Sequence, residues 1–256
     1  MLGVGPHVGW SVADECAGWL NGTLDTWLPA DLARHRVKPG GFTSQSMQDK
    51  WLFEHFFRKM YERSERNGRT LTYVDVAANH YKRISNTYFY DACLKWRGLC
   101  VEPNPIYHDE LRRFRTCDLV PTCASNATAE IDLVLPPHQW LGGMGGVAGG
   151  TLATWASRAY PKAQWREATR RLRCVKLGDE LERRGLTHID FMSLDVEGHE
   201  ESVLRGIDFS RIKISHILCE AGCERILLPL GYTSVKRDGE GGTERLYVMK
   251  KAKGDS

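Results

Sequence analysis

The stretch LTYVDVAANHYKRISNTYFYDACLKWRGLCVE, residues 71–102, decides the fold. It begins with an apolar, β-branched run at 71–76, continues through a polar loop, and passes into a segment whose aromatic residues recur at helical spacing. Gly98 ends this helix, and residues 99–102 form a second apolar run. A strand, a capped helix and a second strand in this order are typical of a parallel sheet that is covered by helices.

The same alternation continues on both sides of this stretch. Before it, Ser46 and Asp49 resemble a capping box and predict the start of an amphipathic helix that ends at Asn67-Gly68. After it, Asn104 and Pro105 predict the start of another helix. Further strands are expected at residues 117–124, 130–135, 173–177, 189–196, 214–220, 232–235 and 245–249. We predict an α/β fold with a seven-stranded, mostly parallel Rossmann-like sheet, helices on both faces and a C-terminal antiparallel hairpin.

We expect one domain, at residues 44–252, preceded by an N-terminal extension at 1–43. The domain contains a glycine-rich loop, 136–165, in which residues 142–150 hold six glycines. Such a segment is typical of a mobile surface loop, either a plain insert or a lid over a ligand. No Gly-Lys-Ser/Thr sequence ends it, which argues against a phosphate-binding P-loop.

Composition excludes several classes of protein. The 256 residues carry 35 Lys and Arg against 32 Asp and Glu, a net charge of only +3, and the charges of both signs are scattered. This gives no electrostatic case for a nucleic-acid partner. No run approaches the roughly 18 apolar residues that would span a bilayer, so no membrane span is expected.

The cysteines and the N-terminus bear on the compartment. Eight cysteines without a CxxC pair are too sparse to suggest a disulfide scaffold, so we expect most of them to be small core residues. Cys117 and Cys123 are close enough in sequence to pair in an oxidising compartment. The N-terminus does not resemble a signal peptide. We predict a cytoplasmic protein, while the glycosylation sequons at Asn21 and Asn126 leave a secretory lumen open.

Acidic residues stand where four of the predicted strands end. They are Asp75, Glu102, Asp195 and Glu220. Ligands of open parallel sheets bind beyond these strand ends, and an acid after the second strand is placed to accept hydrogen bonds from ribose hydroxyls. The loop after the first strand lacks G-x-G-x-x-G, which disfavours a dinucleotide. The pattern therefore favours a nucleoside cofactor such as S-adenosylmethionine.

Four blocks of sequence resemble the FkbM-type S-adenosylmethionine-dependent methyltransferases. They are SQSMQDKWLFEHFF (44–57), VDVAANHYKRISNTYFYD (74–91), WRGLCVEPNPIYHDEL (96–111) and IDFMSLDVEGHEESVLRG (189–206). With the spacing between them they cover residues 44–220 in the order of the family. The resemblance implies a seven-stranded methyltransferase fold with a terminal reversed hairpin.

The resemblance also assigns roles to residues at the strand ends. It implies S-adenosylmethionine contacts at Asp75, Ala77, Asn79, Glu102, Cys123, Ala124 and Ser125. It implies that Asp195 and Glu197 face the methyl group. His199 is a further candidate for a catalytic base. The spacing of these groups matches no metal motif, and we predict no metal.

Two residues depart from the family pattern. The family usually has glycine where this chain has Ala77, and a small residue where it has Tyr81. Ala77 adds a methyl group against the cofactor, and Tyr81 is expected to narrow the entrance. We predict O-methylation of a small-molecule or glycan hydroxyl. The alternatives are a catalytically degenerate methyltransferase-like binding or scaffold domain and a nucleotide-dependent enzyme of another kind, and neither the acceptor nor the oligomeric state is predicted.

Overall fold

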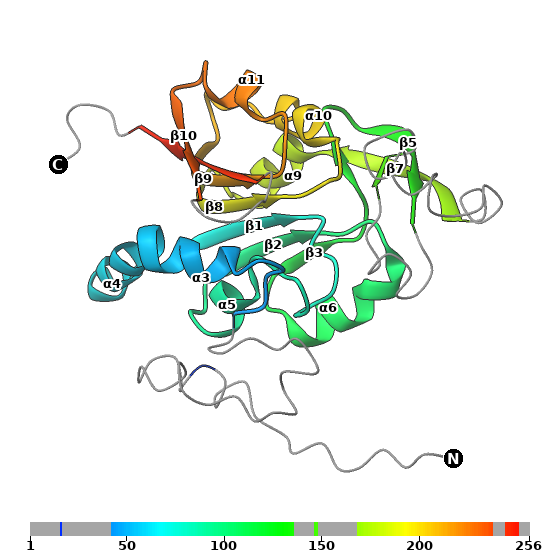
Figure 1. Cartoon of the computed structure of the whole chain (residues 1–256). Helices are drawn as coiled ribbons and strands as arrows, with labels where there is room; N and C mark the ends of the chain where they lie inside the picture. The colour runs from blue at the N-terminus through cyan, green and yellow to red at the C-terminus, as the bar shows by residue number, and fades with distance from the viewer. Residues whose placement is uncertain (1–15, 17–41, 136–145, 148–167, 238–243, 251–256) are drawn as a thin grey trace, which may run out of the picture.

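A seven-stranded sheet forms the centre of the molecule (Figure 1). The computed structural model describes residues 16, 42–135, 146–147, 168–237 and 244–250. The strand order is β10-β11-β9-β8-β1-β2-β3, and every neighbouring pair is parallel except β10–β11 and β11–β9. The strands are β1 (Thr72–Val76), β2 (Arg97–Val101), β3 (Asp118–Val120), β8 (His188–Leu194), β9 (Lys213–Cys219), β10 (Tyr232–Lys236) and β11 (Arg245–Met249). The predicted sheet and its C-terminal hairpin are confirmed.

Helices cover the sheet on both faces (Figure 1). One face carries α3 (Gln48–Leu52), the π-helix η2 (Phe53–Phe57), α4 (Arg58–Asn67), α5 (Tyr88–Ala92), the 3₁₀ turn η3 (Pro105–Tyr107) and α6 (His108–Phe114). The other face carries α9 (Leu177–Arg183), α10 (Glu200–Arg205) and α11 (Glu224–Leu227).

Alternate residues of the strands supply the two layers of the core. In β1, Val74 and Val76 join an aliphatic cluster under α9, α10 and α11. Tyr73 points to the opposite face and joins a cluster rich in aromatic side chains, including Phe57 and Trp96. This period of two places the intervening Asp75 on the aromatic side as well, although its neighbours there are polar.

The first helical segment differs in detail from its prediction. Helices α3, η2 and α4 follow one another without a break, but a π-helical turn lies in the middle. Ser44, and not Ser46, pairs reciprocally with Asp49: the Ser44 hydroxyl donates to the carboxylate at 2.5 Å and accepts from the Asp49 amide at 3.2 Å. The capping box expected at Ser46 was therefore wrong, because the carboxylate turns back to the extended residues before the helix.

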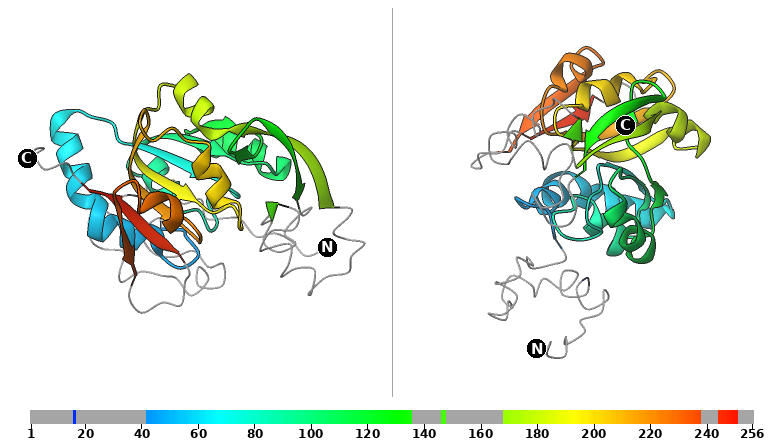
Figure 2. Two further views of the ribbon diagram at one scale, coloured as in Figure 1. Left: turned by 90° about the horizontal axis from the view of Figure 1, so that it is seen from above. Right: turned by 90° about the vertical axis from the view of Figure 1, so that its right-hand side faces the viewer.

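A second, four-stranded sheet projects from one side of the main sheet (Figure 2). Its order is β4-β7-β5-β6, with β4 (Ala124–Ser125), β7 (Thr169–Lys176), β5 (Ala129–Val134) and β6 (Gly146–Val147). The predicted strands at 130–135 and 173–177 belong to this side sheet. Most of β7 is exposed or half-buried, whereas a central parallel strand is buried on both faces, so these segments do not enter the main sheet.

All eight cysteines form disulfides. The pairs are Cys16–Cys93, Cys100–Cys117, Cys123–Cys174 and Cys219–Cys223. Most of the cysteines are core residues, as expected, but all of them are bonded. The predicted Cys117–Cys123 pair was wrong, because Cys117 meets Cys100 beside the β2–β3 ladder and Cys123 meets Cys174 where β4 pairs with β7. The first bond also ties the predicted N-terminal extension to the end of α5.

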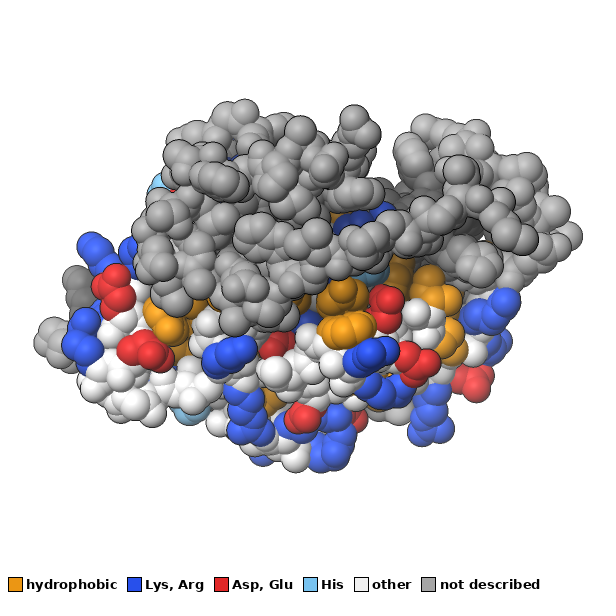
Figure 3. All heavy atoms as spheres, turned by 90° about the horizontal axis from the view of Figure 1, so that it is seen from below, with side chains coloured by type: hydrophobic (Ala, Val, Ile, Leu, Met, Phe, Trp, Pro, Cys, Tyr) orange, Lys and Arg blue, Asp and Glu red, His pale blue; other side chains and the backbone are white. Residues whose placement is uncertain are grey.

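Two predicted segments lie largely outside the described residues. They are the extension at 1–43, except Cys16 and residues 42–43, and the glycine-rich loop at 136–165, except residues 146–147. Within the part that the structure describes, no helix is long and apolar enough to cross a membrane. Figure 3 shows one face of the described surface, on which basic and acidic side chains are interspersed and not segregated.

Candidate functional site

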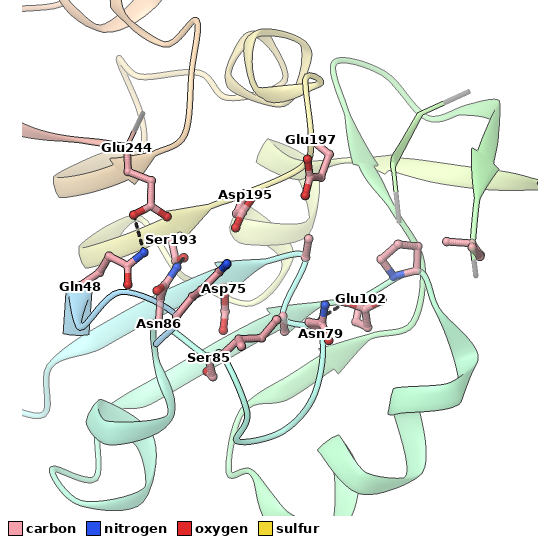
Figure 4. A pocket seen from close by; sticks show the side chains of 16 residues that line it. Gln48, Asp75, Asn79, Ser85, Asn86, Glu102, Ser193, Asp195, Glu197 and Glu244 are labelled. Carbon is pink, nitrogen blue, oxygen red and sulfur yellow. Dashed lines mark hydrogen bonds between the residues drawn. The ribbon is translucent and has the colours of Figure 1, made fainter. Parts of the chain in front are cut away.

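A polar pocket lies at the carboxyl ends of β1, β2 and β8 (Figure 4). Six of the predicted site residues line it: Asp75, Ala77, Asn79, Glu102, Asp195 and Glu197. Because parallel strands end at one edge of the sheet, residues from three distant parts of the chain meet there. We call this space the polar pocket.

The loop after β1 has an unusual backbone. Ala77, Asn79 and Ile84 have φ angles of 67°, 57° and 60°, in the left-handed region. Asn tolerates this region, whereas Ala is strained in it and a β-branched Ile is a clear outlier. The loop is held nonetheless, because the amides of Ala77 and Ala78 both donate to the Val101 carbonyl of β2, at 2.9 and 3.1 Å. The left-handed φ at Ala77 explains why the FkbM-type sequences usually have glycine at this position.

Glu102 joins this loop to the end of β2. Its two carboxylate oxygens accept hydrogen bonds from the backbone amides of Asn79 and Asn104, both at 2.7 Å. The side chain is only 4% exposed. Burial raises the pKa of Glu102 to about 7, against the opposing effect of these two hydrogen bonds. Each oxygen has a second lone pair that can accept a further donor at the pocket.

Asp75 belongs to a buried ionic network below the pocket. Its carboxylate accepts from the Thr87 hydroxyl, which also accepts from the guanidinium of Arg115 at 2.6 Å. Arg115 pairs with Asp91 at 2.6 Å and donates to the Tyr73 hydroxyl at 2.9 Å. Burial raises the pKa of Asp75, and the nearby guanidinium opposes this shift. The network holds Asp75 and the start of α5 in place, and no sequence pattern marks Arg115 as its centre.

Three carboxylates cluster at the ends of β8 and β9. One carboxylate oxygen from each of Asp195, Glu197 and Glu220 lies within 4.8 Å of the others. Burial, followed by repulsion from Glu220 and then Glu197, raises the pKa of Asp195 well above its usual value. Burial, with Glu220 the largest charge contribution, raises the pKa of Glu197 to about 7. The geometry would also suit a divalent cation, so the prediction that no metal is required stays a prediction.

A buried glutamate shapes the loop that carries these groups. Glu200 is 2% exposed, and its Oε1 accepts from the amides of Val196 and Gly198 at 3.1 and 3.2 Å. This arrangement accommodates the left-handed φ of 55° at Glu197. Glu200 thus holds the backbone of the loop that carries the catalytic candidates, which precedes α10.

A second, more apolar pocket adjoins the first. Its lining includes Val76, Ala77, Val101, Pro103, Cys123, Ala124, Leu133, Cys174, Val196 and His199. Ala77 and Pro103 line both pockets, so the two spaces meet there. We call this second space the apolar pocket.

The structure separates His199 from the polar pocket. Its ring lines the apolar pocket, and its Nε2 lies 3.0 Å from the hydroxyl of Ser125. Burial lowers its pKa. Ser125, itself only 2% exposed, lines neither pocket and instead contacts His199 and Ser202. The predicted site residues therefore form two groups and not one.

Several lining residues were not predicted from the sequence. Gln48 and Glu244 lie opposite the strand ends and share a hydrogen bond of 2.5 Å (Figure 4). Asn86 donates to the Ser193 hydroxyl at 3.1 Å, and both line the polar pocket. No local motif marks such residues. Tyr81, expected at the entrance, lines neither pocket and stacks on His80 at 4.6 Å between ring centroids.

The strand order and the polar pocket at the carboxyl ends of the parallel strands define an α/β protein with a Rossmann-like sheet and a candidate ligand site in the usual place. The sequence model of the Methyltransferase FkbM domain matches residues 75–224, more than half of the 256-residue chain, and the chain belongs to this family. The match includes every predicted site residue. Searches of curated proteins and of solved structures found no match.

Proposed function

We propose that this chain is an active methyltransferase that uses S-adenosylmethionine and methylates a hydroxyl of a small molecule or glycan. The observation that carries the proposal is that a polar and an apolar pocket lie next to each other, with Ala77 and Pro103 lining both. The buried carboxylate of Glu102 lines the polar pocket, next in sequence to the shared Pro103. S-adenosylmethionine has an apolar purine at one end and a ribose with a charged amino-acid chain at the other. Its apolar and polar parts therefore follow the same order as the two pockets.

In this proposal each part of the cofactor has its own residues. The adenine occupies the apolar pocket against Cys123 and Ala124, and the ribose hydroxyls donate to Glu102. The amino-acid chain lies near Asp75 and Asn79, and the methyl group faces Asp195 and Glu197. Among the described residues, every charged side chain that lines the polar pocket is acidic. These residues are Asp75, Glu102, Asp195, Glu197 and Glu244. Such a site favours the net positive charge of S-adenosylmethionine.

When bound, the cofactor supplies a methyl group already activated by its sulfonium. An acceptor hydroxyl held beside Asp195 and Glu197 would receive this methyl group on its oxygen. Asp195 or Glu197 takes the hydroxyl proton. A base with a pKa of about 7, as at Glu197, is well matched to this task near neutral pH. Orientation of the acceptor by the pocket can contribute about 7–11 kcal/mol.

The alternative of a degenerate scaffold domain is not favoured. It was suggested by Ala77 and Tyr81, but Ala77 keeps both the left-handed φ of 67° and its hydrogen bond to Val101. Tyr81 lines neither pocket. The loop therefore retains the shape that a glycine would give it, and a nucleotide-dependent enzyme of another class is disfavoured by the family.

Titration calorimetry with S-adenosylmethionine tests the cofactor assignment. We expect micromolar binding by the wild type, and roughly tenfold or greater weakening in Glu102→Ala, because a hydrogen bond to a charged group contributes about 1.5–3 kcal/mol. Glu102→Gln keeps one acceptor oxygen, so its affinity should lie between those of the wild type and Glu102→Ala. Glu130→Gln, on the exposed side sheet, is the matched control and should bind as the wild type does.

Two outcomes would count against this account. A folded Glu102→Ala protein with wild-type affinity would remove the ribose assignment alone. A wild type that binds neither S-adenosylmethionine nor S-adenosylhomocysteine would remove the cofactor.

We also propose that the protein works in an oxidising compartment and not in the cytoplasm. Four disulfides use all eight cysteines, a pattern that reducing compartments rarely allow. Each bond removes two hydrogens, so the intact protein purified without reductant should be lighter than its reduced form by about 4 × 2 = 8 mass units. Recovery of the native protein with free thiols would contradict this.

A further inference from the structure

We propose that the Cys123–Cys174 disulfide is a working part of the cofactor site, so that the oxidised protein binds S-adenosylmethionine and the reduced protein binds it much more weakly. The inference rests on the proposed function and deepens it. It concerns how the apolar pocket is held together, which neither the family nor the sequence pattern indicates.

The bond lies in the wall of the pocket. Both of its cysteines line the apolar pocket, together with Ala124 and Leu133 from the same side sheet. The opposite wall comes from the main sheet and its loops, through residues such as Val76 and Val101. The side sheet therefore supplies one whole wall of this pocket. Of the other three disulfides, none has a cysteine lining either pocket.

The disulfide is one of several contacts that hold this wall. Ala124 also packs in the main aliphatic cluster, and Ser125 contacts His199 and Ser202 of the α10 region. The buried cluster of the side sheet consists of Cys123, Leu133, Leu135 and Cys174, so half of its members are the bonded cysteines. Their exposed fractions are 6% and 1%. By contrast, the main sheet is packed on both faces by two large clusters. The disulfide is therefore the covalent contact in a wall whose own buried cluster is small.

The bond also fixes the register of the strands next to it. Cys123 immediately precedes β4, and Cys174 lies in β7. Val175 donates to the Cys123 carbonyl at 2.8 Å, and Ala124 pairs with Val175 in the parallel ladder. This ladder has only two residue pairs, so its few hydrogen bonds alone would hold β4 weakly.

Reduction would act directly at this wall. A dithiol reductant transfers two electrons and two protons to the two Sγ atoms, and its own thiols become a disulfide. The protein sulfurs then separate from a bond length of about 2.05 Å to non-bonded contact. Without the covalent link the separation of 4.5 Å between the Cα atoms of Cys123 and Cys174 is no longer fixed, and β4 and β7 are free to move apart where the adenine would bind.

Two double variants isolate the role of this bond. Cys123→Ala/Cys174→Ala removes it, whereas Cys100→Ala/Cys117→Ala removes a buried disulfide that touches neither pocket. Each variant is titrated with S-adenosylmethionine, with and without a dithiol, and its thermal unfolding and far-ultraviolet circular dichroism are recorded. Amide hydrogen exchange at Val175 reports the β4–β7 ladder without any cofactor.

We expect Cys123→Ala/Cys174→Ala to bind roughly tenfold or more weakly, and reduction to change its affinity no further. The Cys100→Ala/Cys117→Ala protein should unfold at lower temperature yet bind as the oxidised wild type does, and should lose affinity on reduction. Exchange at Val175 should be fast in Cys123→Ala/Cys174→Ala under all conditions, and should accelerate on reduction in the wild type and in Cys100→Ala/Cys117→Ala. A role in stability alone would lower both melting temperatures and leave both affinities unchanged.

The outcomes separate this inference from the proposed function. Equal affinity of the oxidised wild type and a folded Cys123→Ala/Cys174→Ala protein, with unchanged exchange at Val175, overturns the inference and leaves the proposed function standing. Failure of the oxidised wild type to bind the cofactor overturns the proposed function, and the inference falls with it.

Discussion

The main sheet and the side sheet are stabilised in different ways, although both contribute to one site. The main sheet is covered on both faces by large apolar clusters and encloses the buried Arg115 network. The side sheet has a small cluster that includes one disulfide, and its ion pair between Arg171 and Glu130 is exposed. The polar pocket thus lies on the sheet with the large buried clusters, whereas one wall of the apolar pocket comes from the side sheet and contains a disulfide.

The largest expected effect is on the buried network of the main sheet. Replacing Arg115 by Met leaves Asp91 and Asp75 without their cation, in a place where Arg115 and Asp91 are 0% and 1% exposed. Breaking a buried pair from one side costs about 3–5 kcal/mol. Urea unfolding should show this loss in the free energy of unfolding. A cost below about 1 kcal/mol would mean that the network contributes little to the stability of the main sheet.

The next effect is a dependence of stability on pH. The pKa of Glu102 is raised to about 7 from its usual 4.5, so between these values the folded protein binds a proton that the unfolded chain releases. The contribution of Glu102 to stability is therefore greatest below about pH 4.5, falls as pH rises to about 7, and does not change above that pH. The contribution is up to roughly 3 kcal/mol for such a shift.

Unfolding midpoints measured without cofactor between pH 4.5 and 8 would show this effect. Glu102→Gln should reduce the slope of stability against pH, leaving the part that comes from Asp195 and Glu197, whose pKa values are also raised. Glu130→Gln should leave the slope unchanged. Saturating S-adenosylmethionine should reduce the fall, because its positive charge favours the ionised carboxylates. A slope in Glu102→Gln equal to that of the wild type would assign the titration to other groups.

A smaller effect is expected in the loop after β1. Ala77→Gly removes the strain of an alanine at φ 67° but adds flexibility to the unfolded chain, and the net stabilisation should be about 0.5–1 kcal/mol. Cofactor affinity should change little or improve modestly, because the loop already has the required shape. Ala78→Gly, whose φ is not in the left-handed region, is the control and should destabilise. Destabilisation by Ala77→Gly would show that the loop geometry is not strained.

The smallest effect is expected on the side sheet. Arg171 and Glu130 pair at 2.8 Å, but their side chains are 67% and 61% exposed. Exposed pairs contribute about 0–1 kcal/mol, so Arg171→Gln should change neither the melting temperature nor cofactor affinity measurably. A clear loss of affinity would mean that surface charges help to hold the side sheet in place.

The main sheet could be predicted because each buried strand is an apolar run between turn residues. The acidic strand ends followed directly, since a parallel sheet brings them to one edge, and Glu102 and Asp195 indeed line one pocket. The π-helical turn and the role of Ser44 depend on tertiary packing, which local patterns do not contain.

The side sheet and the disulfides could not be predicted in the same way. Eight cysteines allow 105 pairings, and sequence proximity favoured Cys117 with Cys123 where the strands bring together Cys123 and Cys174. Strand β7 is rich in arginine and lacks the apolar run of a buried strand. Arg115 follows two exposed arginines of α6, so nothing in its sequence distinguishes the one that turns inward.

The central claim is that one cofactor occupies both pockets, and a crystal structure of the oxidised protein with S-adenosylhomocysteine tests it most directly. We expect the adenine against Cys123 and Ala124 in the apolar pocket, and both ribose hydroxyls within hydrogen-bond distance of the Glu102 carboxylate. The sulfur should point toward Asp195 and Glu197. Density for the ligand at any other place, or a ribose that does not contact Glu102, would contradict the account.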